Sequence, residues 1–160
     1  MVVRDELGRY SFRGKQSEAD ILGIAEDILR RRLERLGSLT TPEHAGSFLR
    51  MRLAHLEHEE FHAVWLDTRH RVLAVETLAR GSIDGASIHA REVVKAALRW
   101  NASAVVFAHN HPSGEPEPSA ADRAITGRLR DALDLVDVRL LDHIVVGTAG
   151  TVSLAQRGWC

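Results

Sequence analysis

The chain has 160 residues, of which 44% are hydrophobic and 27% are charged, and its formal net charge at pH 7 is −1. A chain of this size can bury one core and carry a short additional arm, and its balanced charge does not favour a nucleic-acid partner, which usually meets a strongly basic domain. The single cysteine, Cys160, excludes an internal disulfide and a cysteine-rich zinc site, so any metal must be held by histidine and carboxylate side chains.

The N-terminal segment, residues 1–16, is polar and has no clear period, which predicts a loose arm. Its first ten residues are charged and lack the apolar segment of a signal peptide. No run of about 18 apolar residues occurs in the chain, so we expect no membrane span. Together these features predict a cytoplasmic protein.

A first helix is predicted to begin after Ser17, which can act as its N-cap together with Asp20 three positions later. Apolar residues then recur at helical spacing on one stripe, and Gly37 is expected to end the helix. A second helix follows, with Thr41 as its cap and Pro42 at its first position. We place the boundary between an N-terminal arm and helix, residues 1–40, and the main domain, residues 41–160, at this point.

The rest of the main domain alternates strand and helix patterns. In chain order we expect a hairpin over 61–67 and 71–78, a loop over 81–85, a helix over 88–100, a buried strand over 104–108, a helix over 119–135 and strands over 138–146 and 151–154. Prolines and Gly114 exclude regular structure between 112 and 118. This order predicts an α/β fold, a three-layer α-β-α sandwich around a mixed sheet, preceded by the small helical arm.

A metal site is predicted where the buried strand ends. His109 and His111 are two positions apart, so their side chains point to the same face and can approach one metal at about 2.0–2.1 Å. The proline-rich loop turns the chain back and delivers Asp122 in the first turn of the next helix. The positive potential of a helix N-terminus keeps such a carboxylate ionised, as a ligand must be. We therefore predict that His109, His111 and Asp122 hold a metal.

Three protein ligands leave the fourth tetrahedral position open for water, which is typical of catalytic zinc. We expect one zinc ion per chain, although iron or manganese would also fit histidine and carboxylate ligands. Ser119 could donate a hydrogen bond to a developing oxyanion. A hydrolase of this kind also needs a general base, and the upstream candidates are Glu57, Glu59, Glu60 and Glu76.

Each of these residues also has an ordinary structural explanation. A single histidine near a buried strand is commonly a core residue, and Ser119 with Asp122 forms the spacing of a helix capping box. His143 lies in an apolar strand, where we expect a buried residue oriented by Asp142. The remaining histidines show no convergent spacing and are expected at the surface: His44, His55, His58, His62 and His70.

The combination resembles a known family. His-x-His-Pro and Ser-x-x-Asp, with ten residues between His111 and Asp122, resemble the JAMM (MPN+) metalloprotease motif. The flanking segments, over about residues 40 to 158, resemble the RadC family more narrowly: His89-x-Arg-Glu-Val, Ala108-His109-Asn110-His111-Pro112-Ser113-Gly114 and Leu140-Leu141-Asp142-His143. The resemblance is to the short, single-domain form, because the helix-hairpin-helix DNA-binding region of longer members is missing. Ala90 stands where the family usually has proline.

The resemblance also bears on the base. In RadC-like sequences the glutamate usually lies two residues before a strand phenylalanine, which selects Glu59 through Phe61. Strand alternation would place Glu60 on the opposite face, and Glu60 is the second candidate. The resemblance implies a zinc metallopeptidase that hydrolyses amide or isopeptide bonds in a protein or peptide substrate.

Two other functions compete with this one. The chain could be a non-catalytic, metal-containing module linked to DNA repair or DNA metabolism, although its neutral charge disfavours direct contact with nucleic acid. A zinc deaminase has a similar sandwich fold but needs a Pro-Cys-x-x-Cys element, which the single Cys160 excludes. The sequence leaves the substrate and the oligomeric state open.

Overall fold

The computed structural model of the protein describes residues 2–4, 9–12, 14–35, 42–81 and 88–160. The predicted helix end at Gly37, the predicted cap at Thr41 and most of the expected loop over 81–85 lie outside these residues. Within the described ranges, no helix combines the length and the apolar character that a membrane span requires.

Four helices and seven strands are described in these ranges. The helices are α1 (Glu18–Arg35), α2 (Pro42–Leu53), α3 (Ala90–Arg99) and α4 (Ala120–Asp134). The strands are β1 (Val2–Arg4), β2 (Tyr10–Phe12), β3 (Glu60–Leu66), β4 (Val72–Arg80), β5 (Ala104–Asn110), β6 (Arg139–Gly147) and β7 (Gly150–Ser153). The elements expected in the main domain are therefore present, with ends displaced by one or two residues in most cases.

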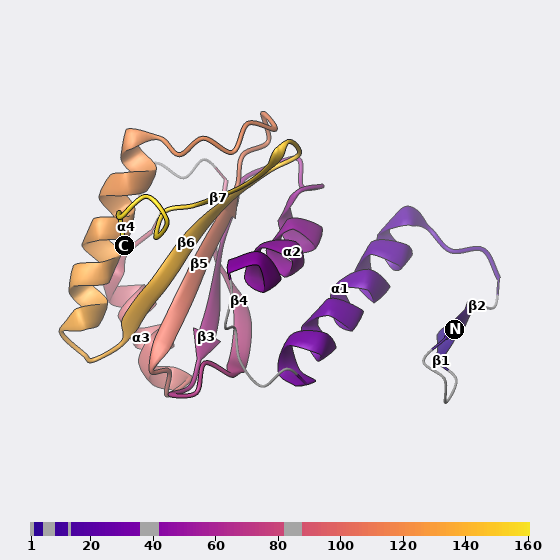
Figure 1. Ribbon diagram of the computed structural model, residues 1–160, viewed down its shortest axis with the longest axis horizontal. Coiled ribbons are helices and arrows are strands. Elements are labelled where there is room, and N and C mark those ends of the chain that lie inside the picture. Colours follow the sequence, from indigo (N-terminus) through magenta and orange to yellow (C-terminus); the bar gives the residue numbers. More distant parts are fainter. Residues whose placement is uncertain (1, 5–8, 13, 36–41, 82–87) are drawn as a thin grey trace.

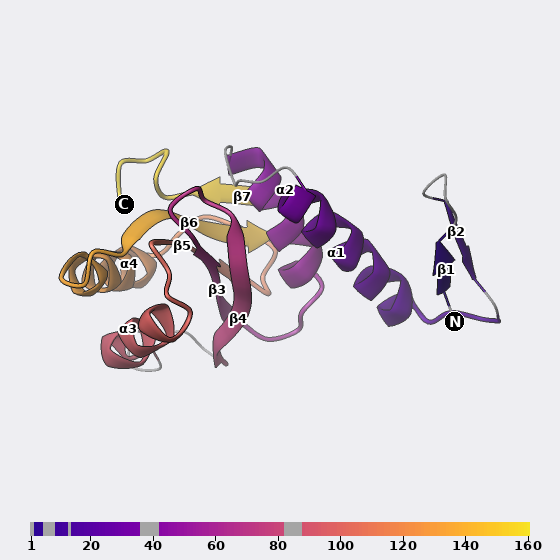
Figure 2. The same cartoon turned by 90° about the horizontal axis from the view of Figure 1, so that it is seen from below.

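The main sheet has five strands in the order β4-β3-β5-β6-β7. Strands β5 and β6 are parallel and the other neighbours are antiparallel, so the sheet is mixed as predicted. Helix α2 covers one face, and α3 and α4 cover the other (Figures 1 and 2). The predicted three-layer α-β-α sandwich is confirmed.

Two hydrophobic cores lie on the two faces of this sheet. Alternate side chains of β3 belong to different cores. Phe61, Ala63 and Trp65 pack towards α3 and α4, whereas Val64 and Leu66 pack towards α2. Strand β5 divides in the same way, because both strands lie in the middle of the sheet and are buried on both faces. A side chain at the end of β3 or β5 therefore belongs to one core or the other according to its position in the alternation.

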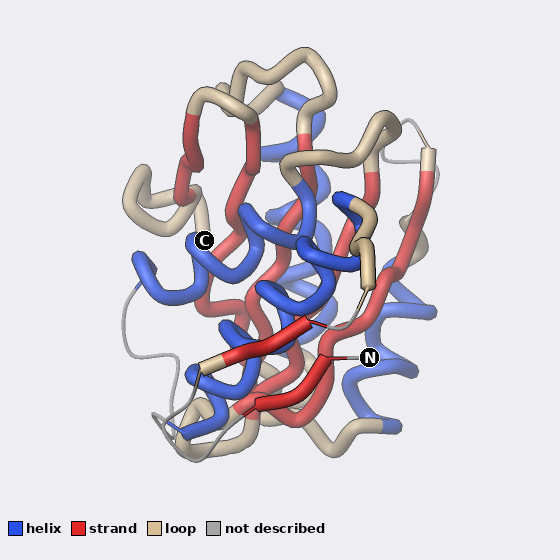
Figure 3. The backbone as a smooth tube through the Cα atoms, turned by 90° about the vertical axis from the view of Figure 1, so that its right-hand side faces the viewer, coloured by secondary structure: helices blue, strands red, loops and turns tan. Residues whose placement is uncertain are grey.

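The N-terminal arm differs in part from the prediction. Ser17 caps α1 as expected, because its hydroxyl accepts the Asp20 backbone N–H at 3.1 Å while the Asp20 carboxylate accepts the Ser17 N–H at 2.9 Å. The loose arm predicted for residues 1–16 is wrong for the described part of that segment, since β1 and β2 pair antiparallel (Figure 3) and lie past the start of α1 in Figure 1. Three-residue strands carry too little pattern to be found from sequence.

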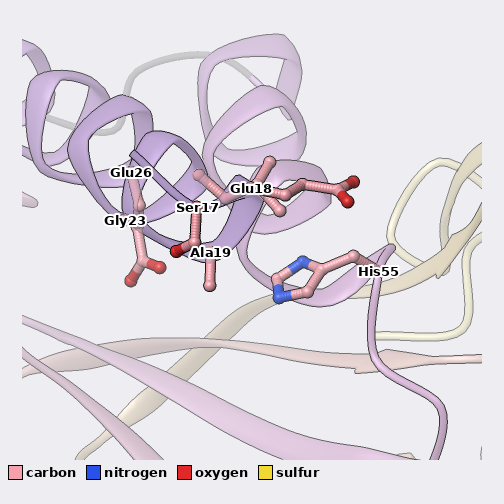
Figure 4. A pocket seen from close by; sticks show the side chains of 7 residues that line it. Ser17, Glu18, Ala19, Gly23, Glu26 and His55 are labelled. Atoms are coloured by element: carbon pink, nitrogen blue, oxygen red, sulfur yellow. The ribbon is translucent and has the colours of Figure 1, made fainter. Parts of the chain in front are cut away.

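A hollow of about 540 Å³ lies between α1 and the segment that follows α2. Its lining includes the cap Ser17 and, from α1, Glu18, Gly23 and Glu26, with the His55 ring facing them across the hollow (Figure 4). None of the predicted site residues lines it. The N-terminal helix therefore contributes a surface feature that is separate from the predicted metal site.

The loop between β5 and α4 is held against the end of β6. The His111 backbone N–H donates to the Val146 carbonyl at 2.8 Å, and the Ala149 N–H donates to the Gly114 carbonyl at 3.2 Å. A Cβ atom at Gly147 would lie 2.2 Å from the Gly114 carbonyl oxygen, which is closer than van der Waals contact allows. Only glycine at position 147 permits this approach, which fixes the backbone that carries His111.

We expect Gly147→Ala to lower the free energy of unfolding by about 1–3 kcal/mol, because the new methyl group would displace the Gly114 backbone. Gly127→Ala is the matched control, since a Cβ there meets no atom within 4 Å and alanine favours the helix. Thermal unfolding of both variants measures the effect. Equal melting temperatures for Gly147→Ala and the unmodified protein would show that the loop tolerates displacement.

Candidate metal centre

The three predicted ligands meet at the carboxyl end of β5. His109 lies in β5, His111 follows directly after it, and Asp122 lies in the first turn of α4. Strand β5, helix α4 and strand β6 form a parallel crossover unit, and the carboxyl ends of such strands are where ligand sites form. Strand β3 runs antiparallel to β5 with Phe61 opposite His109, so the start of β3 lies at the same edge.

The ligand atoms of these residues converge closely. The His109 Nε2 atom lies 3.0 Å from His111 Nε2 and 3.2 Å from Asp122 Oδ1, and His111 Nε2 lies 3.3 Å from Asp122 Oδ2. Atoms bound tetrahedrally at 2.0–2.1 Å from one metal are about 3.3 Å apart. His109 is 1% exposed and Asp122 is 4% exposed, whereas His111 is half-buried. The cluster could hold a metal ion.

A buried chain of hydrogen bonds fixes the tautomer of His109. The Thr126 hydroxyl donates to the Asp122 carbonyl at 2.6 Å, so at its 2.6 Å contact with His143 it must accept the Nδ1 hydrogen. Burial lowers the pKa of His143 well below its ordinary value, which keeps the ring neutral and leaves its Nε2 without hydrogen. That Nε2 accepts from His109 Nδ1 at 2.8 Å. A neutral His109 therefore presents the Nε2 lone pair to the cluster.

A second contact fixes His111. Its Nδ1 atom lies 2.9 Å from the Glu115 carbonyl oxygen, which can only accept, so Nδ1 carries the hydrogen of a neutral ring and Nε2 is again a bare acceptor. With the ionised Asp122 carboxylate, three acceptors then converge and none supplies a hydrogen. Converging acceptors repel one another unless a cation lies between them. The two imidazole nitrogens and the carboxylate oxygens, each with a lone pair directed into the cluster, thus fit a bound metal ion.

The pKa shifts reflect the same demand for positive charge. Burial alone would raise the pKa of Asp122, but the adjacent His109 and His111 rings, which hydrogen-bond the carboxylate when protonated, hold that pKa well below its usual range. The contact with Asp122 raises the pKa of His111 despite partial burial. The negative charge of Glu59 contributes in the same direction. Without a metal, a proton on a ring is the cation that the cluster attracts.

Ser119 forms the predicted capping box with Asp122. Its hydroxyl oxygen accepts the Asp122 N–H at 3.1 Å, and the Asp122 carboxylate accepts the Ser119 N–H at 2.7 Å. The hydroxyl hydrogen of Ser119 finds no acceptor among the described residues, and the side chain is exposed beside the cluster. The capping role is therefore present, and the hydroxyl retains a hydrogen that it can donate.

Glu59 and Glu60 lie in different surroundings. Glu60 shares the α2 face of the sheet with His62, and its carboxylate contacts His62 Nε2 at 2.7 Å and His58 Nε2 at 3.0 Å. Although burial would raise the pKa of Glu60, these hydrogen bonds and nearby positive charges lower it below its ordinary value. Glu59 is half-buried and directly precedes β3; if the alternation of β3 continued to it, its side chain would lie on the face of Phe61 and His109.

The other two glutamate candidates lie elsewhere. Glu57 is exposed in the segment before β3. Glu76 in β4 accepts hydrogen bonds from Arg99 at 2.9 Å and from the Trp100 indole at 2.7 Å, so its carboxylate anchors the end of α3. Among the main causes that raise the pKa of His111 is the negative charge of Glu59.

Two predictions about histidines are corrected. His62 was expected at the surface but is 2% exposed, because it belongs to the buried alternation of β3 and bonds Glu60 and Arg52. Asp142 does not orient the His143 ring as expected; its carboxylate accepts the backbone N–H groups of His143 and Ala155. Thr126 contacts the ring instead, and no sequence pattern indicated that role.

Comparison with known proteins agrees with the sequence resemblance. The family model for the RadC-like JAB domain matches residues 39–159. A protein of Vibrio cholerae named UPF0758 protein is 50% identical over 151 residues, covering 94% of this chain and 95% of the relative. A protein of that name from Chromohalobacter salexigens is 57% identical over 164 residues, covering 99% of this chain and 73% of the relative. One from Xanthomonas oryzae is 53% identical over 141 residues, and the match spans only 63% of its length.

The hydrogen-bond chain behind His109 can be tested at Thr126. Thr126→Val keeps the shape of the side chain and removes the hydroxyl that accepts from His143, so we expect the affinity for a divalent transition metal to fall about 10- to 100-fold. Thr126→Ser restores the hydroxyl and should restore affinity. Calorimetric titration with cobalt(II) measures both. An unchanged affinity in Thr126→Val would show that the chain does not govern the ligand.

Proposed function

This chain belongs to the RadC-like JAB domain family, within a metalloprotease-type superfamily, and from this premise we propose that it is a zinc-dependent hydrolase of amide or isopeptide bonds. The observation that carries the proposal is the convergence of three acceptor atoms, from His109, His111 and Asp122, next to a half-buried glutamate. A structural metal site would need no such glutamate. The combination supports a hydrolytic centre.

Zinc is the metal that suits the ligand set best. Two imidazole nitrogens and one carboxylate oxygen are the ligands of many catalytic zinc sites, and three protein ligands leave one position for solvent or substrate. When bound, zinc polarises a carbonyl group and lowers the pKa of water. The fixed tautomers of His109 and His111 support the assignment, because both ligand nitrogens are free of hydrogen when the rings are neutral.

In this proposal the residues of the chain divide the chemistry between them. Glu59 accepts a proton from the attacking water as the water oxygen bonds to the carbonyl carbon. Glu59 then passes that proton to the leaving nitrogen as the carbon–nitrogen bond breaks. The Ser119 hydroxyl donates a hydrogen bond to the carbonyl oxygen while negative charge develops on it.

The substrate class follows from the family and from the reaction. We propose a protein or peptide substrate in the cytoplasm, bound directly at the edge where β5 ends. Direct binding of nucleic acid finds no support in a net charge of −1. The alternative of a non-catalytic module predicts the same metal but no role for Glu59, and the two are therefore separable by experiment.

The ligand assignment predicts the metal content of variants. The purified protein should hold about one zinc ion per chain, and His109→Ala and His111→Ala should each lose it. Asp122→Ala should lose zinc and also about 1 kcal/mol of stability, because the residue closes the capping box. Asp122→Asn should lose zinc with a smaller loss of stability. Elemental analysis and thermal unfolding measure these effects, and full zinc content in both Asp122 variants would leave that residue as a cap only.

The general base is tested by Glu59→Gln, which keeps the size of the side chain and cannot take up a proton. We expect zinc content and fold to be retained and turnover of a cleaved peptide, found in a peptide library, to fall about 100-fold or more. Glu60→Gln is the matched control: it should keep turnover and lose stability, because it weakens the buried contacts with His58 and His62.

Three outcomes would contradict this account. Loss of turnover in Glu60→Gln alone would transfer the role to the neighbouring residue. If Glu59→Gln and Glu60→Gln both keep the turnover of the unmodified protein, neither glutamate is the general base. A zinc-loaded protein that cleaves no peptide of the library would favour the non-catalytic module.

A further inference from the structure

Asn110 lies between the two histidine ligands in the sequence, but its side chain lies on the opposite face of β5. It is 2% exposed, so its amide must find partners inside the protein. Its Oδ1 atom accepts the backbone N–H of Glu60 at 2.8 Å, and its Nδ2 donates to the backbone carbonyl of His58 at 2.9 Å. Both halves of the amide are therefore used, and both bind the same short segment.

One of these two bonds is to the residue before Glu59 and the other is to the residue after it. At this edge of the sheet, the backbone pairing between β3 and β5 ends with Phe61 opposite His109. Beyond that pair, the side-chain amide of Asn110, rather than backbone hydrogen bonds, joins residues 58–60 to β5. On the other side, the Glu59 carbonyl accepts the Gly81 N–H at 2.9 Å, so the residue is fixed from both neighbouring strands.

The same segment is also fixed by its side chains. Glu60 is held on the α2 face by His62 and His58, so its carboxylate is bound away from the ligands. Since Asn110 is bonded covalently to both His109 and His111, one tripeptide carries two ligands on one side and the anchor of Glu59 on the other. A change at Asn110 thus alters the position of Glu59 relative to the ligands.

We propose that Asn110 is the positioning residue for Glu59, and this proposal rests on the function proposed above. A general base acts only within hydrogen-bond reach of the proton it removes, and small displacements of reacting groups cost large factors in rate. The planar amide carries a donor and an acceptor side by side, so one side chain satisfies both the Glu60 N–H and the His58 carbonyl. Asn110 acts through Glu59 and touches neither substrate nor metal.

The kinetic test combines two substitutions. Asn110→Ala should keep about one zinc per chain and lower kcat about tenfold with KM nearly unchanged. In a Glu59→Gln background the same substitution should lower kcat less than twofold, because no base remains to be positioned. Asn110→Val, which favours a strand and has neither donor nor acceptor, should behave like Asn110→Ala and serves if the alanine variant does not fold.

Asp67→Ala is the matched control. Asp67 lies at the far end of β3, where its carboxylate accepts the N–H groups of Arg69 and Arg71 at 2.9 Å each. Its loss removes two bonds between a side chain and the backbone from the turn that follows β3, away from the cluster, and should leave kcat unchanged. Full turnover in zinc-loaded Asn110→Ala, or an equal loss with and without Glu59, would overturn the proposal.

A measurement independent of activity keeps the two proposals apart. Hydrogen exchange of the Glu60 and Gly81 amides, followed by NMR, should be about tenfold faster in Asn110→Ala and unchanged in Asp67→Ala. Unchanged exchange at both amides would overturn the role of Asn110 even if peptides are cleaved. If the unmodified protein cleaves no peptide, the proposed hydrolase is contradicted, and the exchange rates alone decide whether Asn110 holds the segment.

Discussion

The structure depends on a local electrostatic constraint: when both imidazoles are neutral, three acceptor atoms meet at one point and none of them brings a hydrogen. His109, His111 and Asp122 each direct a lone pair into a space of about 3 Å between their ligand atoms. Such an arrangement is unfavourable unless a cation occupies it. The surrounding protein enforces it, because buried partners hold the hydrogens of both imidazoles on the far nitrogens. The site is therefore organised around a positive charge that the chain itself does not supply.

The sandwich fold makes this constraint possible. Strand β5 is buried on both faces, so consecutive residues reach two different environments. His109 faces α4, where Thr126 and His143 extend the hydrogen-bond chain, and Asn110 faces the other layer, where it binds the start of β3. The ligands and the glutamate segment are thus linked through adjacent residues of one strand. A strand exposed on one face could not hold both sets of contacts away from water.

The parts of this site that depend on local spacing could be predicted from the sequence. The switch between strand and helix periods predicted the layers, and the Ser119 to Asp122 spacing predicted a cap that the structure confirms. Contacts that depend on packing between elements, such as the one from Thr126 in α4 to His143 in β6, leave no local pattern in the sequence. The burial of His62 was missed because isolated histidines were assigned to the surface, although the alternation of β3 contained the signal. The role of Glu59 as a base stays a prediction.

The most direct measurement is X-ray absorption spectroscopy at the zinc edge on the purified, zinc-loaded protein. The account predicts a four-coordinate site with two imidazole nitrogens and one carboxylate oxygen at about 2.0–2.2 Å, one further oxygen from solvent and no sulfur. The imidazole contribution should fall by half in a protein that lacks either His109 or His111 yet still binds some zinc. A six-coordinate shell of oxygen atoms without imidazole, or a sulfur ligand from Cys160, would contradict the account.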